Sequence, residues 1–252
     1  MRKIIIVILL LIGSAPLMSQ RFIGSVIVGG NLTQVDGDEV YGYKKAGLNA
    51  GLAVSVALNK NQSWFLTVEM LFSQKGSHKA NYADTMYMKD PNTVNVINWN
   101  VRYNRRVKYD LRLNYVEIPV VFHYEDLKTG FAIGAGLCWG RLIYVKEIES
   151  GYRLTTDLDS RTFSKNEWSA IGDVKFKLYK NLKLNFRFQY TFVPIRSRDY
   201  YSKDGKKNET RQQYNNVLTL RLIYTFNEKY KLNDHYDKKG KRIGTKWIRE
   251  VK

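Results

Sequence analysis

Histidine and cysteine are the side chains of this sequence best suited to nucleophilic or metal-dependent chemistry, and their spacing supports neither. The three histidines, His78, His123 and His235, fall in a predicted loop, a predicted strand and the C-terminal tail. This scatter is unlike the clusters that bind zinc or complete a catalytic triad. The single cysteine, Cys138, has no His or Asp at motif spacing, which favours a packed side chain over a catalytic thiol. We therefore expect no enzyme activity, no cofactor and no metal site.

Charged residues at the polar positions of apolar-alternating segments offer a different chemistry, which is the ion pair. Buried charges are tolerable only when they are paired and hydrogen-bonded. We therefore predict a charge network inside the fold, in which carboxylates face guanidinium and ammonium groups. Its predicted members are Glu69, Glu117, Asp173, Lys175, Lys177, Arg187 and Arg221.

The segments that carry these charges alternate strictly between apolar and polar residues. From Leu182 to Phe192 every second residue is apolar, and the residues between them, among them Arg187, are polar. A period of two is typical of a β-strand with one apolar face. The composition, with 18 Tyr, 11 Phe and only 4 Pro, favours an all-β fold. Alternation alone does not separate a soluble sandwich from a barrel in a membrane.

Long and short connections alternate between about eight such segments. The predicted strands are 22–32, 47–58, 63–75, 110–124, 129–143, 167–179, 182–195 and 214–226. An even strand number, short periplasmic turns and long extracellular loops are typical of outer-membrane barrels. We therefore predict an antiparallel transmembrane β-barrel of about eight strands in the bacterial outer membrane. A barrel of that size is filled by side chains and leaves no open channel.

The outer and inner faces of the predicted barrel have further signatures. The shift of the apolar phase between Tyr115 and Val116 indicates a β-bulge. The inner face of one strand is predicted to carry Gly130, Gly134, Gly136 and Gly140, because a narrow barrel leaves little room there. The aromatic girdle is predicted to include Trp64, Tyr124, Tyr179, Tyr190, Tyr224 and Phe226.

The N-terminus predicts export. Arg2 and Lys3 precede the apolar run 4–12, and small residues with a proline follow as far as Ser19, as in a secretory signal peptide. We place the signal peptide at 1–19, the barrel at 20–226 and a periplasmic tail at 227–252. The net charge of +18 then favours anions outside the cytoplasm, such as lipopolysaccharide phosphates and other outer-membrane lipids, and not nucleic acid.

The tail carries nine basic residues against four acidic ones. Two interpretations stay open for it. It could be a solvated extension, or it could dock onto an acidic periplasmic partner such as a secretion-system protein, or onto the inner leaflet. The predicted docking residues are Lys238, Lys239, Lys241, Arg242 and Trp247.

Three stretches resemble a known family. Residues 29–38, GGNLTQVDGD, and 42–51, GYKKAGLNAG, look like the start of the PorT-like outer-membrane β-barrel family of the Bacteroidetes, and 113–119, LNYVEIP, is similar to its middle motif. The resemblance covers about 22–226 and implies a non-enzymatic barrel that assists type IX protein secretion. Family members commonly end at the last aromatic residue of the final strand, whereas this chain continues for the whole tail.

Two other functions stay open from the residues alone. The barrel could be structural or adhesive and bind extracellular ligands through its loops. It could also be a lipid-modifying enzyme, which would need a Ser–His pair at one height of the lipid face.

Overall fold

The computed structural model describes residues 22–38, 40–59, 62–83, 106–149, 152–154, 158, 160, 162–201, 207–226, 228–236 and 242–251. The predicted signal peptide lies outside these residues. Within them, no helix is long and apolar enough to cross a membrane. The strands are β1 (Phe22–Asp36), β2 (Lys45–Ala57), β3 (Trp64–Ala83), β4 (Arg106–Asp126), β5 (Phe131–Glu149), β6 (Tyr152–Arg153), β7 (Asn166–Tyr179), β8 (Leu182–Thr191), β9 (Arg196–Tyr201), β10 (Lys207–Thr225), β11 (Glu228–Tyr236) and β12 (Arg242–Val251).

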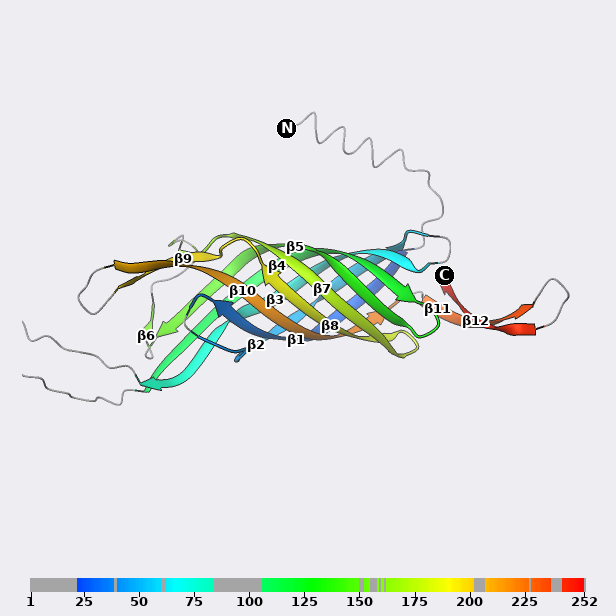
Figure 1. The fold of residues 1–252 in the computed structure, drawn as a ribbon, viewed down its shortest axis with the longest axis horizontal. Coiled ribbons are helices and arrows are strands. Elements are labelled where there is room, and N and C mark those ends of the chain that lie inside the picture. Colours follow the sequence, from blue (N-terminus) through cyan, green and yellow to red (C-terminus); the bar gives the residue numbers. More distant parts are fainter. Residues whose placement is uncertain are drawn as a thin grey trace, which may run out of the picture.

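Eight of these strands close into a barrel (Figure 1). Their order is β1-β2-β3-β4-β5-β7-β8-β10, every neighbouring pair is antiparallel, and β10 pairs back onto β1 from Thr225 opposite Ser25 to Tyr214 opposite Asp36. Closure removes the exposed edges that an open sheet would present. The antiparallel all-β fold predicted from the alternation is therefore confirmed. The short strands β6 and β9 pair with β5 and β10 within segments that the sequence predicted as loops.

The two ends of the barrel differ in how the strands are joined. At one end, here called the turn end, β2 is joined to β3, β4 to β5 and β7 to β8 by short connections. Asp126 braces one of these turns by accepting hydrogen bonds from Thr129 Oγ1 and Lys128 N, and the bond from Thr129 holds the pKa of this exposed carboxyl below its usual value. At the other end, the loop end, β3, β4, β5 and β10 run for 19 to 21 residues. This exceeds the ~9–11 residues needed to cross a bilayer, so the strands extend past the apolar band.

The outer wall of the barrel is apolar. Alternate side chains of every barrel strand face outward, including Leu52, Ile133, Phe186, Phe188 and Leu220, which are 45–55% exposed. Aromatic residues gather at the turn end, where the rings of Trp64 and Tyr124 lie 4.9 Å apart. The prediction of a bulge in β4 is wrong, because the inward phase of β4 continues unbroken through Tyr115 and Glu117. The β4–β5 register shifts instead at an extra residue of β5, Ile143, since Asn114 lies opposite Tyr144 and Tyr115 lies opposite Leu142.

The tail forms a β-hairpin beyond the turn end (Figure 1). Strands β11 and β12 pair from Glu228 opposite Val251 to Tyr236 opposite Arg242, so the backbone here is regular. Lys238, Lys239 and Lys241 lie outside the described residues. Only the backbone of Arg242 and Trp247 is described, so their predicted docking role stays a prediction.

Candidate functional site

The lumen is filled by charged side chains at successive heights, and the central group is organised around Glu69 on β3. Its carboxylate accepts hydrogen bonds from Arg187 on β8, with Nη1 and Nη2 each at 2.8 Å, and from Nη1 of Arg221 on β10 at 2.9 Å. All three side chains are at least 97% buried. Bidentate guanidinium–carboxylate pairs are the strongest ion pairs in geometry and energy. These contacts tie strands from opposite sides of the barrel together.

Asp173 on β7 extends this group toward β4. Arg187 Nη2 donates to Asp173 Oδ2 at 2.7 Å, and Nε2 of His123 lies 2.8 Å from Asp173 Oδ1. His123 and Asp173 are both in register with Gly134 of the intervening strand β5. A Cβ at Gly134 would lie 2.3 Å from His123 Cδ2, so the glycine makes room for the imidazole to reach across β5. The predicted inner glycine therefore has a specific role.

A second group lies closer to the loop end. Lys75 on β3 contacts Glu117 on β4 and Glu167 on β7, each at 2.5 Å, and all three are about 99% buried. Gln189 donates to Glu117 at 3.0 Å, and Asn215 donates to Glu167 at 2.7 Å. The cysteine of the sequence packs below this group against Val121 and Ile171, as predicted for a buried side chain.

Above these pairs the barrel has an apolar core. It is built from buried residues of several strands and of the segments beyond them: Val35, Val40, Tyr109, Leu111, Leu113, Tyr115, Leu142, Val145, Phe163 and Ile195. Within it, Arg196 donates to both oxygens of Glu147 at 3.1 and 3.0 Å, and the Tyr109 hydroxyl donates to Glu147 at 2.7 Å. The loop end is therefore packed shut as well.

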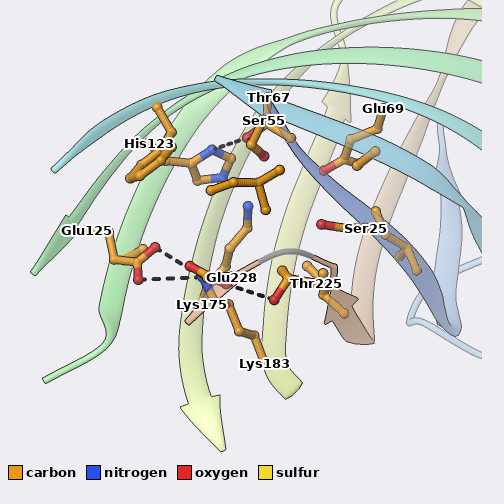
Figure 2. Close-up of a pocket in the computed structure, with 16 residues that line it drawn as sticks. Ser25, Ser55, Thr67, Glu69, His123, Glu125, Lys175, Lys183, Thr225 and Glu228 are labelled. Atoms are coloured by element: carbon orange, nitrogen blue, oxygen red, sulfur yellow. Dashed lines mark hydrogen bonds and ion pairs between the residues drawn. The ribbon is translucent and has the colours of Figure 1, made fainter. Parts of the chain in front are cut away.

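The turn end is closed by the first residue of the tail hairpin (Figure 2). Lys183 on β8 lies 3.2 Å from Glu125 on β4 and 3.3 Å from Glu228 on β11. Thr225 Oγ1 donates to the other Glu228 oxygen at 2.7 Å. Glu228 is 1% exposed, so the tail begins inside the barrel mouth. This contact fastens β11 to the barrel.

A small cavity of about 40 Å³ separates this mouth from the central group (Figure 2). Lys175 lies among its lining residues, together with Ser25, Ser55 and Thr67. Lys175 was predicted as a member of the ion-paired network, but among the described residues it has no ion-pair or hydrogen-bond partner. A water needs ~10–15 Å³ of such space, so the cavity has room for a few waters that could solvate the ammonium.

One constellation in this region has the order used in nucleophilic catalysis. Thr67 Oγ1 lies 3.3 Å from His123 Nδ1, and His123 Nε2 contacts Asp173, which gives hydroxyl, imidazole and carboxylate in sequence. Thr67 also shares a hydrogen bond with Ser55 at 2.9 Å. The adjoining space of about 40 Å³ is too small for a lipid or peptide substrate. We interpret the constellation as a structural hydrogen-bond chain.

The structure places five of the seven residues of the predicted network in buried ion pairs, whereas Lys177 lies near the turn end, opposite Lys183. Glu69, Asp173, Arg187 and Arg221 form the central group, and Glu117 belongs to the second group. Lys175 lies in the cavity instead. Sequence reasoning missed further charged partners of the buried ion pairs, among them Lys75, Glu125, Glu147, Glu167, Lys183, Arg196 and Glu228. Among the described residues, no group of three or more His, Cys, Asp or Glu could hold a metal ion.

Asp38, in the connection between β1 and β2, has a shifted pKa. Asp38 Oδ1 accepts from Val40 N at 2.8 Å, and Oδ2 is buried without a hydrogen-bond partner, as is Ser77 Oγ. Burial raises the pKa of Asp38 to about 6. A protonated Asp38 can donate to Ser77, which accounts for two otherwise unsatisfied atoms.

A match to a family model agrees with this architecture, and the chain is also similar at low identity to several solved structures. A family model described as "Outer membrane protein beta-barrel domain" matches residues 20–197. No curated protein matches the chain. Among solved structures, the attachment invasion locus protein Ail of Yersinia pestis is similar at 12% identity, with 81% of this chain and 98% of that chain covered and a TM-score of 0.42. A major outer membrane protein from Thermus thermophilus gives 12% identity, 81% and 99% coverage and a TM-score of 0.43. Neisserial surface protein A gives 9% identity, 81% and 96% coverage and a TM-score of 0.40.

Proposed function

Because this chain belongs to the outer-membrane protein β-barrel family and lies in the bacterial outer membrane, we propose that it is a closed, non-enzymatic barrel that assists protein secretion. The barrel acts through its two ends and not through its lumen. The turn end faces the periplasm and presents the tail hairpin, and the loop end faces outward. The PorT-like motifs at 29–38, 42–51 and 113–119 support type IX secretion as the pathway.

The buried ion pairs of the lumen are the observation that carries this proposal. Glu69, Arg187 and Arg221 bridge the barrel at mid-height, and Lys75, Glu117 and Glu167 bridge it again nearer the loop end. A solute would have to break several buried charge pairs to pass, each at a cost of ~3–5 kcal/mol. Transport through this lumen is therefore unfavourable, and binding at the ends is the function that remains.

The buried position of Glu228 supports a role for the periplasmic end of the barrel. Through Lys183 and Thr225 it fixes the start of β11 at the barrel mouth, so the hairpin leaves the barrel from a defined point. A tethered hairpin with a basic composition can capture an acidic periplasmic partner at less cost in orientational freedom than a loose tail. Secretion-system proteins are the class of partner that the family resemblance suggests.

Two truncations test this role. A chain that ends at Tyr230 removes most of the hairpin but keeps Glu228, so we expect a heat-modifiable barrel of wild-type stability and loss of exported proteins from the medium. A chain that ends at Phe226 also removes Glu228, one of the two carboxylates that pair with Lys183, so we expect it to be less stable by ~1–3 kcal/mol. Unchanged secretion by the chain ending at Tyr230 would remove the tail from the mechanism.

A structural or adhesive role remains as a second candidate. Strands β3, β4, β5 and β10 extend past the membrane-spanning segment at the loop end. Their extensions enclose a packed apolar core there. Such a rigid stem could present loops to extracellular ligands. Deletion that leaves secretion intact but abolishes adhesion would favour this role, whereas altered lipid A by mass spectrometry would favour a lipid-modifying enzyme.

A further inference from the structure

Three cations on the outer wall of β4 and β5 lie toward the loop end. Arg112 on β4 and Lys146 on β5 are directly opposite each other in the antiparallel register, and Arg141 lies opposite Val116 on the same pair of strands. Leu111, Leu113 and Val145, their neighbours along the strands, are buried in the lumen, so the three cations face outward. We call Arg112, Arg141 and Lys146 the basic arc.

No carboxylate among the residues that the structure describes forms an ion pair with the basic arc. Among the described residues Arg112 and Lys146 have no ion-pair or hydrogen-bond partner, and Arg141 donates only to the neutral amide of Asn166, at 2.8 Å. Like charges directly opposite each other on neighbouring strands destabilise a sheet. By contrast, nearly every luminal charge of this barrel is paired. The uncompensated pair of Arg112 and Lys146 therefore points to an external anion.

The position of the arc relative to the apolar band identifies that anion. Ile118, Trp139 and Trp168 form an apolar row on this wall, adjacent in register on β4, β5 and β7. Beyond it, Ile143 and Tyr144 are exposed between Arg141 and Lys146, so apolar and basic side chains alternate there along β5. Arg141 lies two residues beyond Trp139, or about 5 Å along the barrel axis for a tilted strand. Arg112 lies six residues beyond Ile118, or roughly 15 Å. The arc therefore spans the headgroup region of the outer leaflet, directly above an aromatic wall suited to acyl chains.

The opposite side of the barrel, near the loop ends of β1, β8 and β10, has a different chemistry. There Tyr43 donates to Asn216 at 2.7 Å, Asn216 donates to Asp36 at 3.3 Å, and the rings of Tyr190 and Tyr214 stack at 6.2 Å. This side is aromatic, hydrogen-bonded and carries a carboxylate. Other cations near the loop end, such as Lys44 and Arg211, lie away from the β4–β5 wall, and Arg211 is paired with Glu209.

We propose that the basic arc binds the phosphate groups of lipopolysaccharide in the outer leaflet, with Arg141 at the lipid A phosphate and Arg112 and Lys146 at phosphates of the sugars above it. Guanidinium groups bind phosphate bidentately, and an ammonium adds a point charge. The acyl chains pack on Ile118, Trp139 and Trp168. This site requires only the outer-membrane location, so it stands whether or not the protein acts in secretion.

The test uses the full-length protein in mild detergent and defined lipopolysaccharide carrying phosphates on lipid A and the inner core. Native mass spectrometry measures bound lipid, and the midpoint of the heat-modifiable transition measures the stabilisation it gives. We expect binding by the wild type, loss of about tenfold in affinity for the triple variant R112Q/R141Q/K146Q, and a smaller loss for R112Q alone. The matched control is K44Q, an exposed lysine between β1 and β2 on the far side, which should bind as the wild type does.

Two comparisons separate a phosphate site from general attraction to an anionic membrane. Enzymatic removal of the phosphates should weaken the binding of lipopolysaccharide to the wild type about tenfold. It should leave the binding of lipopolysaccharide to the triple variant unchanged. Equal affinity for phosphatidylglycerol and lipopolysaccharide, or an equal effect of K44Q and the triple variant, would overturn the proposal. So would wild-type binding that does not change when the phosphates are removed.

Discussion

Replacing Glu69 with Gln removes the charge around which the central luminal group is built while keeping the shape of the side chain. In the wild type, two carboxylates, Glu69 and Asp173, balance two guanidiniums, Arg187 and Arg221. The variant leaves this group with a net positive charge in the interior. Arg187 keeps its bond to Asp173, whereas Arg221 keeps only Asn185 at 2.8 Å and Asp173 at 3.8 Å.

The expected loss of stability in the variant follows from these lost ion pairs. Removing one partner of a buried ion pair costs ~3–5 kcal/mol, because the remaining charge is left uncompensated. This is a large fraction of the ~5–15 kcal/mol that typically stabilises a folded domain. With a urea dependence of ~2 kcal/mol per M, the unfolding midpoint should fall by roughly 2 M.

The assay is urea unfolding of the barrel in lipid vesicles, followed by the heat-modifiable band and by tryptophan fluorescence. Asp126→Asn is the matched control, since it neutralises a carboxylate in an exposed turn, where the effect should be small. The double variant E69Q/R221Q restores neutrality, so it should be more stable than the sum of the two single losses predicts, by at least ~1 kcal/mol. If E69Q unfolds within ~0.5 kcal/mol of the wild type, the luminal network does not stabilise the barrel and the reasoning fails.

Three further predictions concern the packing at Gly134, the titration of Asp38 and the conductance of the barrel. Gly134→Ala places a methyl group 2.3 Å from His123 Cδ2 and should destabilise by ~1–3 kcal/mol, whereas Gly172→Ala, whose methyl meets nothing within 4 Å, should be neutral or slightly stabilising in the same urea assay. The pKa of Asp38 is raised to about 6 in the fold, so the folded protein binds this proton more tightly than the unfolded chain does. The free energy of unfolding should therefore rise as the pH falls from 7 toward 4, by at most ~3 kcal/mol. In pH-dependent unfolding, Asp38→Asn should abolish this rise. In planar bilayers the wild type should show no steady large conductance, and a large conductance that disappears when Arg187 or Arg221 is mutated would contradict the closed lumen.

The period of two predicted the strands and most of the interior, because a strand in a closed sheet must place alternate residues on opposite faces. The barrel itself followed only when the long and short connections were added. Glu69, Asp173, Arg187 and Arg221 were found from the alternation, since each sits at a polar position between apolar neighbours. Lys175 was assigned by the same rule, but phase gives only the face of a residue and not its height. Whether a luminal cation meets a carboxylate depends on register, which alternation does not specify.

Other features depend on contacts that no local pattern encodes. Glu228 follows the last barrel strand and reads as part of a polar tail, yet it is buried because the chain folds back to Lys183 and Thr225. The strands at the loop end are longer than predicted, since polar residues such as Arg112 and Lys146 interrupt the apolar phase of β4 and β5 above the bulge. A strand that leaves the membrane no longer needs an apolar outer face, so its sequence resembles that of a loop.

The distribution of charge in this barrel separates structural from functional residues. Apart from Lys175, the luminal charges described above are paired with charged groups of other strands, so they hold the sheet closed and have little capacity left for a ligand. Arg112 and Lys146 lie opposite each other on the outer wall and have no ion-pair partner among the described residues. A protein that pairs Glu69, Asp173 and Glu117 internally has no electrostatic reason to leave two cations opposite each other on its outer wall, unless the membrane supplies the anion. The luminal charges therefore account for stability, and the unpaired charges at the surface are where binding partners should be sought.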